Sequence, residues 1–191
     1  MTDPSPPGRP APRPRWRWPA LLAALTVGLV VAVVGYGPGD SPVNRSSGGR
    51  MAPAFAVPDL RDESRTIELE QLRGHPVVLN FWASWCVPCR KELPAFQAVY
   101  SRMGDQLTFL GMNHQDSRDD AVALLRKTGV QYQSGFDPRG RIAQAYALYG
   151  MPTTVFISAG GRILATRTGE MSESQLADQI RDLFAVVVPD G

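Results

Sequence analysis

The only two cysteines of this 191-residue chain lie three positions apart, in the run Trp85-Cys86-Val87-Pro88-Cys89. The run before them, residues 77–82, is apolar and rich in β-branched and aromatic side chains, which is typical of a buried parallel strand. A helical pattern begins directly after them. A Cys-x-x-Cys between a strand and a helix places the first sulfur at the helix N-terminus, where backbone N–H groups and the helix dipole favour a thiolate. This arrangement predicts a cysteine that attacks disulfides.

The length and the charge distribution indicate one folded domain with an N-terminal extension. The chain fits a domain of about 130–150 residues plus that extension. The first 49 residues contain five Arg and two Asp, whereas residues 50–191 contain 15 Lys and Arg against 16 Asp and Glu. The basic charge therefore belongs to the extension, and we expect no nucleic-acid partner.

The extension divides into three parts. Residues 1–19 are rich in Pro and Arg, residues 20–36 are almost wholly apolar, and residues 37–50 are rich in Gly, Ser and Pro. These parts predict a cytoplasmic tail, a single transmembrane anchor and a flexible linker, followed by the domain at residues 51–188. Arg residues before the apolar run and none directly after it predict that the N-terminus lies inside the cell and the domain outside.

A cleaved signal sequence is the alternative interpretation of residues 20–36. The apolar run is longer than usual for a signal sequence, and no clear cleavage site follows it, so we favour an anchor at the cell membrane. Under either interpretation the domain works outside the cytoplasm, where disulfides form and persist.

Periodicity and turn residues predict the elements that hold the two cysteines. The predicted strands lie at 66–69, 77–82, 107–112, 154–157 and 162–166. Two helices are predicted at about 87–103 and from a cap at Asp116 or Ser117 to Gly129. A third begins with residues 142–146 and closes at Tyr149-Gly150, and the last follows a capping box formed by Ser172 and Gln175. Residues 135–140 are expected to form a loop. This order predicts a mixed sheet with helices on both faces.

Several runs together resemble the thioredoxin superfamily, and within it the membrane-anchored, extracytoplasmic TlpA/ResA/DsbE-like branch. The resembling runs are Phe81 to Pro94, Gly111-Met112-Asn113, Phe136-Asp137, Tyr149 to Thr154, and Gly160 to Ile163. The resemblance covers about residues 52–184 and implies a thioredoxin-like α/β fold. In that fold a central mixed β-sheet is flanked by helices, and an inserted helix–strand unit is expected at about residues 116–133.

The resemblance also implies substrate contacts around the dithiol. It implies a cis peptide bond between Met151 and Pro152 beside the sulfurs, and an X–Pro bond is the kind that adopts cis at low cost. Such a turn exposes the backbone of Met151 for pairing with an extended substrate. The residues that the resemblance assigns to substrate binding are Trp85, Val87, Pro88, Met151, Pro152 and Thr153.

Two positions near the cysteines differ from cytoplasmic thioredoxins. Asn80 stands where those proteins carry a buried acid, and Glu92 matches an acid that the TlpA/ResA-like branch carries instead. Residues three apart share a helix face, so Glu92 is expected near Cys89. A partly buried carboxylate there would raise the pKa of the Cys89 thiol and relay its proton. The alternative is a solvent-exposed Glu92 paired with Arg90 or Lys91.

The predicted reaction uses the two cysteines and no cofactor. Cys86 attacks a protein disulfide, and Cys89 then attacks Cys86 and releases the reduced substrate. The resemblance implies that the substrate is apocytochrome c, whose haem-attachment cysteines are kept reduced for cytochrome c maturation. It also implies a transmembrane electron donor of the DsbD/CcdA type.

The sequence leaves one alternative function open and argues against three others. A general oxidase or isomerase of secreted-protein disulfides remains an alternative, and a peroxiredoxin-like peroxidase is disfavoured because Trp85 precedes Cys86. A zinc site is disfavoured because His75 and His114 do not have ligand spacing. Haem attachment is excluded because Arg90 stands where a His would follow the second cysteine. We expect His114 to be a loop residue away from the sulfurs.

Overall fold

The computed structural model describes residues 49–103 and 106–189. The predicted tail, membrane anchor and all but the end of the predicted linker therefore lie outside the described residues. Among the residues that are described, no helix is both long and apolar enough to cross a membrane.

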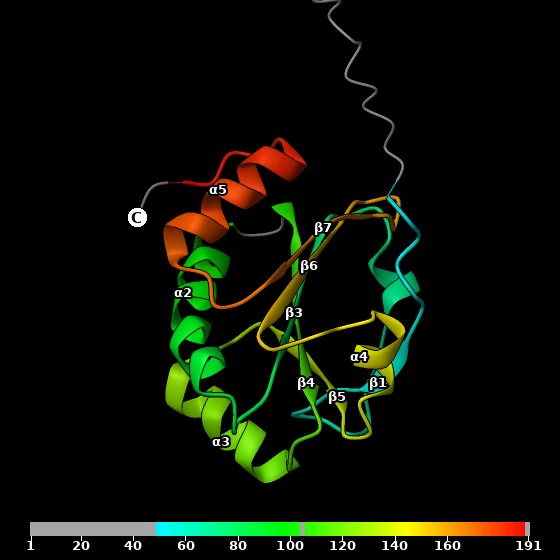
Figure 1. Ribbon diagram of the computed structural model, residues 1–191, viewed down its shortest axis with the longest axis vertical. Coiled ribbons are helices and arrows are strands. Elements are labelled where there is room, and N and C mark those ends of the chain that lie inside the picture. The colour runs from blue at the N-terminus through cyan, green and yellow to red at the C-terminus, as the bar shows by residue number, and fades with distance from the viewer. Residues whose placement is uncertain (1–48, 104–105, 190–191) are drawn as a thin grey trace, which may run out of the picture. The chain divides into compact units, whose positions relative to one another are not determined.

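The centre of the domain is a mixed five-stranded sheet, as predicted (Figure 1). In spatial order the five strands are β5 (Gln133–Asp137), β4 (Thr108–His114), β3 (Val77–Trp82), β6 (Thr153–Ile157) and β7 (Ile163–Thr168). Strands β5, β4 and β3 run parallel, and β6 and β7 continue the sheet with antiparallel pairing. A separate pair, β1 (Ala56–Pro58) and β2 (Thr66–Glu68), is antiparallel.

Both faces of the sheet are covered, which confirms the predicted layers. The helices are α2 (Val87–Met103), α3 (Arg118–Thr128), α4 (Arg141–Ala145) and α5 (Glu173–Phe184), and a short 3-10 helix, η1, spans Leu69–Leu72. One core cluster joins α2, α3 and α5 to one face of the sheet, and a second joins β1, β2, η1 and α4 to the other (Figure 1).

The alternation of side chains along β3 determines what faces the cysteines. Every residue of β3 is buried, and successive side chains point to opposite faces of the sheet. Val78 and Trp82 pack in the cluster with α2, so Asn80, which lies between them in the same alternation, faces that helix as well. The strand thereby points one amide side chain at the helix that carries the dithiol.

The predicted ends of β3 and α2 are confirmed, and so are three predicted helix caps. Pro88 lies in the first turn of α2, where its missing N–H costs no hydrogen bond. The side chain of Ser117 accepts a bond from the α3 backbone, and Gly129 ends that helix with φ 70°. The capping box of Ser172 and Gln175 is present at the start of α5.

The prediction of a loop over residues 135–140 was wrong in its first half. Residues up to Asp137 belong to β5, which pairs with β4 from Gln133 opposite Leu110 to Asp137 opposite His114. The sequence of β5, Gln-Ser-Gly-Phe-Asp, has low strand propensity, and the ladder to a buried neighbouring strand outweighs that preference. The inserted helix–strand unit therefore ends later than expected, and β4 extends to His114 rather than Met112.

Candidate active site

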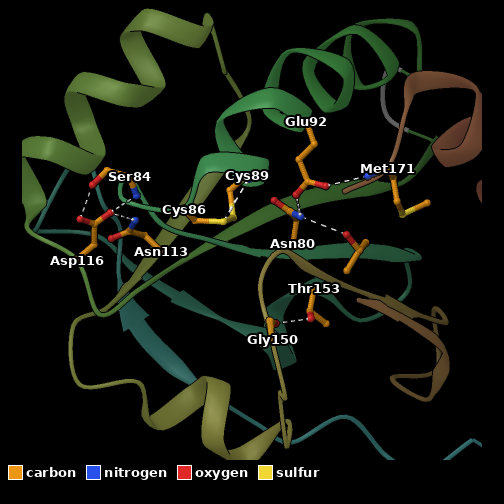
Figure 2. The surroundings of a disulfide bond; sticks show 11 residues. Asn80, Ser84, Cys86, Cys89, Glu92, Asn113, Asp116, Gly150, Thr153 and Met171 are labelled. Atoms are coloured by element: carbon orange, nitrogen blue, oxygen red, sulfur yellow. Dashed lines mark hydrogen bonds between the residues drawn. A yellow bond between two sulfur atoms is a disulfide. The ribbon is translucent and has the colours of Figure 1, made fainter. Parts of the chain in front are cut away.

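The two cysteines lie at the start of α2 and form a disulfide (Figure 2). Cys86 immediately precedes the helix, and its Sγ accepts a hydrogen bond of 3.2 Å from the backbone N–H of Cys89. This is the contact that an N-cap side chain makes with the third helical residue. Cys86 is 5% exposed, whereas Cys89 is fully buried. The sulfur of Cys86 therefore lies at the helix N-terminus, and Cys86 is the less buried of the two cysteines.

The peptide bond between Met151 and Pro152 is cis, as predicted. Strand β6 begins at Thr153, which pairs with Phe81 of the antiparallel β3. The residues before β6 therefore lie at the same edge of the sheet as the residues that follow β3 and lead to Cys86. Thr153 is buried, and its hydroxyl donates a 2.7 Å bond to the carbonyl of Gly150, which holds the bend around Pro152 (Figure 2).

A groove of about 450 Å³ connects the cysteine motif to the cis-proline turn. Its lining is Trp85, His114, Gly140, Ala143, Gln144, Leu148, Gly150 and Met151. Trp85 in this lining is 57% exposed, and Val87 and Tyr149, which are close in sequence to lining residues, are 53% and 97% exposed. The groove thus has the apolar walls and exposed rims that suit an extended polypeptide.

His114 is a correction to the sequence analysis. It was expected in a loop, but it is the last residue of β4, and it lines the same groove as Trp85. Gln144 and Leu148 also line this groove, and sequence reasoning did not select them. Their only signal was a short helical pattern before the cis-proline turn.

Glu92 is buried one helical turn after Cys89 and is held by two hydrogen bonds. Its side chain is 2% exposed, and its Oε1 accepts a 2.8 Å bond from Nδ2 of Asn80. Its Oε2 accepts a 3.2 Å bond from the backbone N–H of Met171 (Figure 2). Nδ2 of Asn80 also donates to Oγ1 of Thr154 at 3.2 Å. The alternative of a solvent-exposed Glu92 is wrong, because the sheet and the loop before α5 enclose it.

This environment moves the ionisation of Glu92 toward neutral pH. Burial raises the pKa of the Glu92 carboxyl to about 7, while the hydrogen bonds from Asn80 and Met171 act in the opposite direction. The negative charge of Glu170 adds to the increase. A carboxyl with a pKa near the working pH both accepts and donates protons readily. Glu92 therefore has the properties of a general acid–base, one helical turn from Cys89.

A second polar cluster holds the residues just before Cys86, and the sequence analysis did not identify it. The carboxylate of Asp116, in the β4–α3 loop, accepts bonds from Ser84 and Asn113 (Figure 2). It also accepts a bond from the backbone N–H of Ser117. The sequence predicted for Asp116 only a possible role as the cap of α3. Nothing in the spacing of Ser84 and Asp116 indicated that they meet.

No set of three or more His, Cys, Asp or Glu residues within 49–103 and 106–189 is arranged to hold a metal ion.

Comparison with known proteins is consistent with this geometry. Residues 49–166 match the model of the AhpC/TSA family. The chain is 33% identical over 135 residues to the thiol:disulfide interchange protein DsbE of Allochromatium vinosum, covering 70% of this chain and 74% of that protein. It is 32% identical over 133 residues to the thiol-disulfide oxidoreductase ResA of Bacillus subtilis, covering 69% and 73%. The crystal structure of a Chlorobium tepidum protein assigned as DsbE superposes with a TM-score of 0.63 at 29% identity, covering 72% of this chain and 96% of that one.

Proposed function

The chain belongs to the AhpC/TSA family and is a thioredoxin-like thiol–disulfide oxidoreductase of the DsbE/ResA type, and on that basis we propose that Cys86 is its nucleophile and Cys89 its resolving cysteine. The observation that carries this assignment is the difference between the two sulfurs. Cys86 lies at the N-terminus of α2 and is 5% exposed, whereas Cys89, one turn into the helix, is fully buried. A substrate disulfide therefore reaches Cys86 first.

The reaction proceeds in two exchanges from the reduced dithiol. The Cys86 thiolate attacks one sulfur of the substrate disulfide, forms a mixed disulfide and releases the other substrate sulfur as a thiolate. The Cys89 thiolate then attacks Sγ of Cys86, which forms the disulfide seen in the structure and releases the second substrate thiolate. The substrate gains two electrons and the protein loses two, which a dithiol donor must return.

Glu92 takes part in the second exchange. Cys89 is fully buried and must lose its proton before it attacks, and Glu92 lies one helical turn away. Its ionised carboxyl accepts that proton. Asn80 and the backbone of Met171 hold the carboxyl in place for the transfer.

The substrate segment lies in the groove between Trp85 and Met151. Its backbone pairs with the backbone of the partly buried Met151, beside the cis Pro152 and the buried Thr153. Trp85, Val87 and Pro88 form the opposite side of the approach to Cys86, and the first two are exposed. The partner is therefore a protein with a disulfide in an accessible, extended segment.

We infer that the physiological substrate is apocytochrome c, whose haem-attachment cysteines this protein keeps reduced. The buried Glu92 in α2 supports the inference, because it matches the acid that the resembling TlpA/ResA/DsbE-like branch carries. The electrons come from a transmembrane donor of the DsbD/CcdA type. General oxidation or isomerisation of secreted proteins is the competing function.

A mixed-disulfide trap separates these functions. The Cys89→Ser variant expressed in its native host cannot release its substrate, so partners remain covalently bound to Cys86. We expect mass spectrometry of these complexes to identify apocytochrome c and a membrane electron donor. Capture of a broad set of secreted proteins without apocytochrome c would instead support the general oxidase or isomerase.

We also propose that residues 20–36 anchor the domain, here residues 51–188, outside the cell membrane. The cationic residues 1–19 before the apolar run and the linker at 37–50 support this orientation. Protease added to intact spheroplasts should digest the domain, and fractionation without protease should recover it with membranes. Recovery of a shortened chain in the soluble extracytoplasmic fraction would indicate cleavage instead.

A further inference from the structure

The carboxylate of Asp116 accepts hydrogen bonds from four donors on three residues, two of which, Ser84 and Asn113, are drawn in Figure 2. The backbone N–H and the hydroxyl of Ser84 each donate at 2.6 Å. Nδ2 of Asn113 and the backbone N–H of Ser117 each donate at 2.9 Å. Ser84 lies two residues before Cys86, so the β4–α3 loop is bonded directly to the segment that leads to the sulfur of Cys86.

The same loop holds the next residue along the chain. The indole N–H of Trp85 donates to the carbonyl of Gln115 at 3.0 Å. Gln115 has φ 45°, a left-handed conformation that residues other than glycine seldom adopt. Its own N–H donates to the carbonyl of Asp137 at the end of β5. Both residues between Ala83 and Cys86 are therefore held by the β4–α3 loop, which is itself bonded to the end of β5.

These bonds act on the turn that positions the sulfur. The N–H of Cys86 donates to the carbonyl of Ala83, so residues 83–86 form a turn between β3 and α2. Ser84 and Trp85 are the two central residues of that turn. A nucleophile displaced by about 1 Å from its productive position can lose about 10²-fold in rate. Contacts that fix residues 84 and 85 therefore govern how accurately Sγ of Cys86 meets a disulfide.

The donor set requires a carboxylate rather than an amide. An ionised carboxylate is a pure acceptor with about four lone-pair sites, which matches the four donors around Asp116. An Asn in its place would turn an N–H₂ group toward donors that are already N–H or O–H. Asn113 is fully buried, and its Nδ2 uses this carboxylate as its hydrogen-bond acceptor.

We propose that Asp116 is a positioning residue that holds the turn before Cys86 and thereby sets the rate at which Cys86 attacks a disulfide. This inference rests on the proposed role of Cys86 as the nucleophile, and it adds a residue of the β4–α3 loop that does not touch the substrate.

The test measures the attack step alone. The full-length chain carrying Cys89→Ser, so that only Cys86 reacts, is mixed in stopped flow with an aromatic model disulfide over a range of pH. At the upper plateau of the profile the thiol is fully ionised, so the plateau rate constant reports positioning rather than ionisation. We expect Asp116→Asn to lower this plateau about tenfold. Ser84→Ala, which keeps the backbone bond, should lower it less.

A control and a double variant make the test specific. Asp119→Asn removes the same charge from an exposed site in the first turn of α3 and should leave the plateau unchanged. Adding Ser84→Ala to Asp116→Asn should cause little further loss, because the two side chains share one contact. Circular dichroism at the assay temperature verifies that each variant is folded.

Three results would overturn the inference. An unchanged plateau in folded Asp116→Asn is one, and an equal loss in Asp119→Asn is another. If Asp116→Asn does not fold, Ser84→Ala decides, and an unchanged plateau in that variant is the third. If Cys86 is not the nucleophile, the Cys89→Ser protein without further changes would not react with the disulfide at all. That result differs from each of the three above, so the two failures can be told apart.

Discussion

Cys86→Ser is expected to abolish turnover in a disulfide-reduction assay with insulin, with a loss of about 10³-fold or more. The thiolate is the nucleophile in disulfide exchange, and a serine hydroxyl remains protonated at the same pH. In this chain the loss should be complete, because Cys89 is the only other cysteine and is fully buried. Turbidity of the reduced insulin chains under a constant supply of dithiol measures the effect.

Cys89→Ser is the matched variant for this prediction. It keeps the sulfur of Cys86, so it should react once with a disulfide and then stop as a mixed disulfide, without turnover. Neither change should unfold the domain, because the loop closed by the disulfide is very short and constrains little of the unfolded chain. Turnover retained by folded Cys86→Ser would refute the assignment of the nucleophile.

Glu92→Gln is expected to slow the resolving step about 10²-fold near neutral pH, the usual scale for the loss of a general base. The wild-type rate of this step should rise with pH through an inflection near pH 7. The sign follows from the carboxyl, whose pKa burial raises to about 7: below that pH it is protonated and cannot accept the proton of Cys89. Quenched-flow measurement of released substrate thiol gives the rate at each pH.

Glu170→Gln is the control for the role of Glu92. Glu170 is exposed, and its charge contributes to the raised pKa of Glu92. Its removal should move the inflection to lower pH and leave the rate above the inflection unchanged. If Glu92→Gln has the same pH profile as the wild type, Glu92 is only a buried structural residue.

The elements that carry the dithiol were predictable because their signals are local. The apolar run of residues 77–82 marks β3, and Pro88 marks the first turn of α2 at the position that the structure shows. Strand β5 lacked such a signal, since its central Ser134 and Gly135 favour neither a strand nor an apolar pattern. Its place in the sheet depends on pairing with β4, which is a tertiary contact.

The surroundings of the cysteines depended on contacts that are distant in sequence. The spacing from Cys89 placed Glu92 on the correct helix face, but its burial results from Asn80 and Met171, which lie 12 and 79 residues away. Ser84 and Asp116 are 32 residues apart and meet only because β3 and β4 are neighbours. Residue types suggested the chemistry, and the fold supplies the partners that control it.

The assignment of Cys86 as the attacking sulfur can be tested most directly by locating the first bond that forms. Reduced full-length protein is mixed with a model disulfide, quenched in acid within milliseconds, digested, and sequenced by mass spectrometry. The account predicts that the mixed disulfide is on Cys86 and is followed by the intramolecular bond to Cys89. A first adduct on Cys89, or equal labelling of both sulfurs, would contradict it.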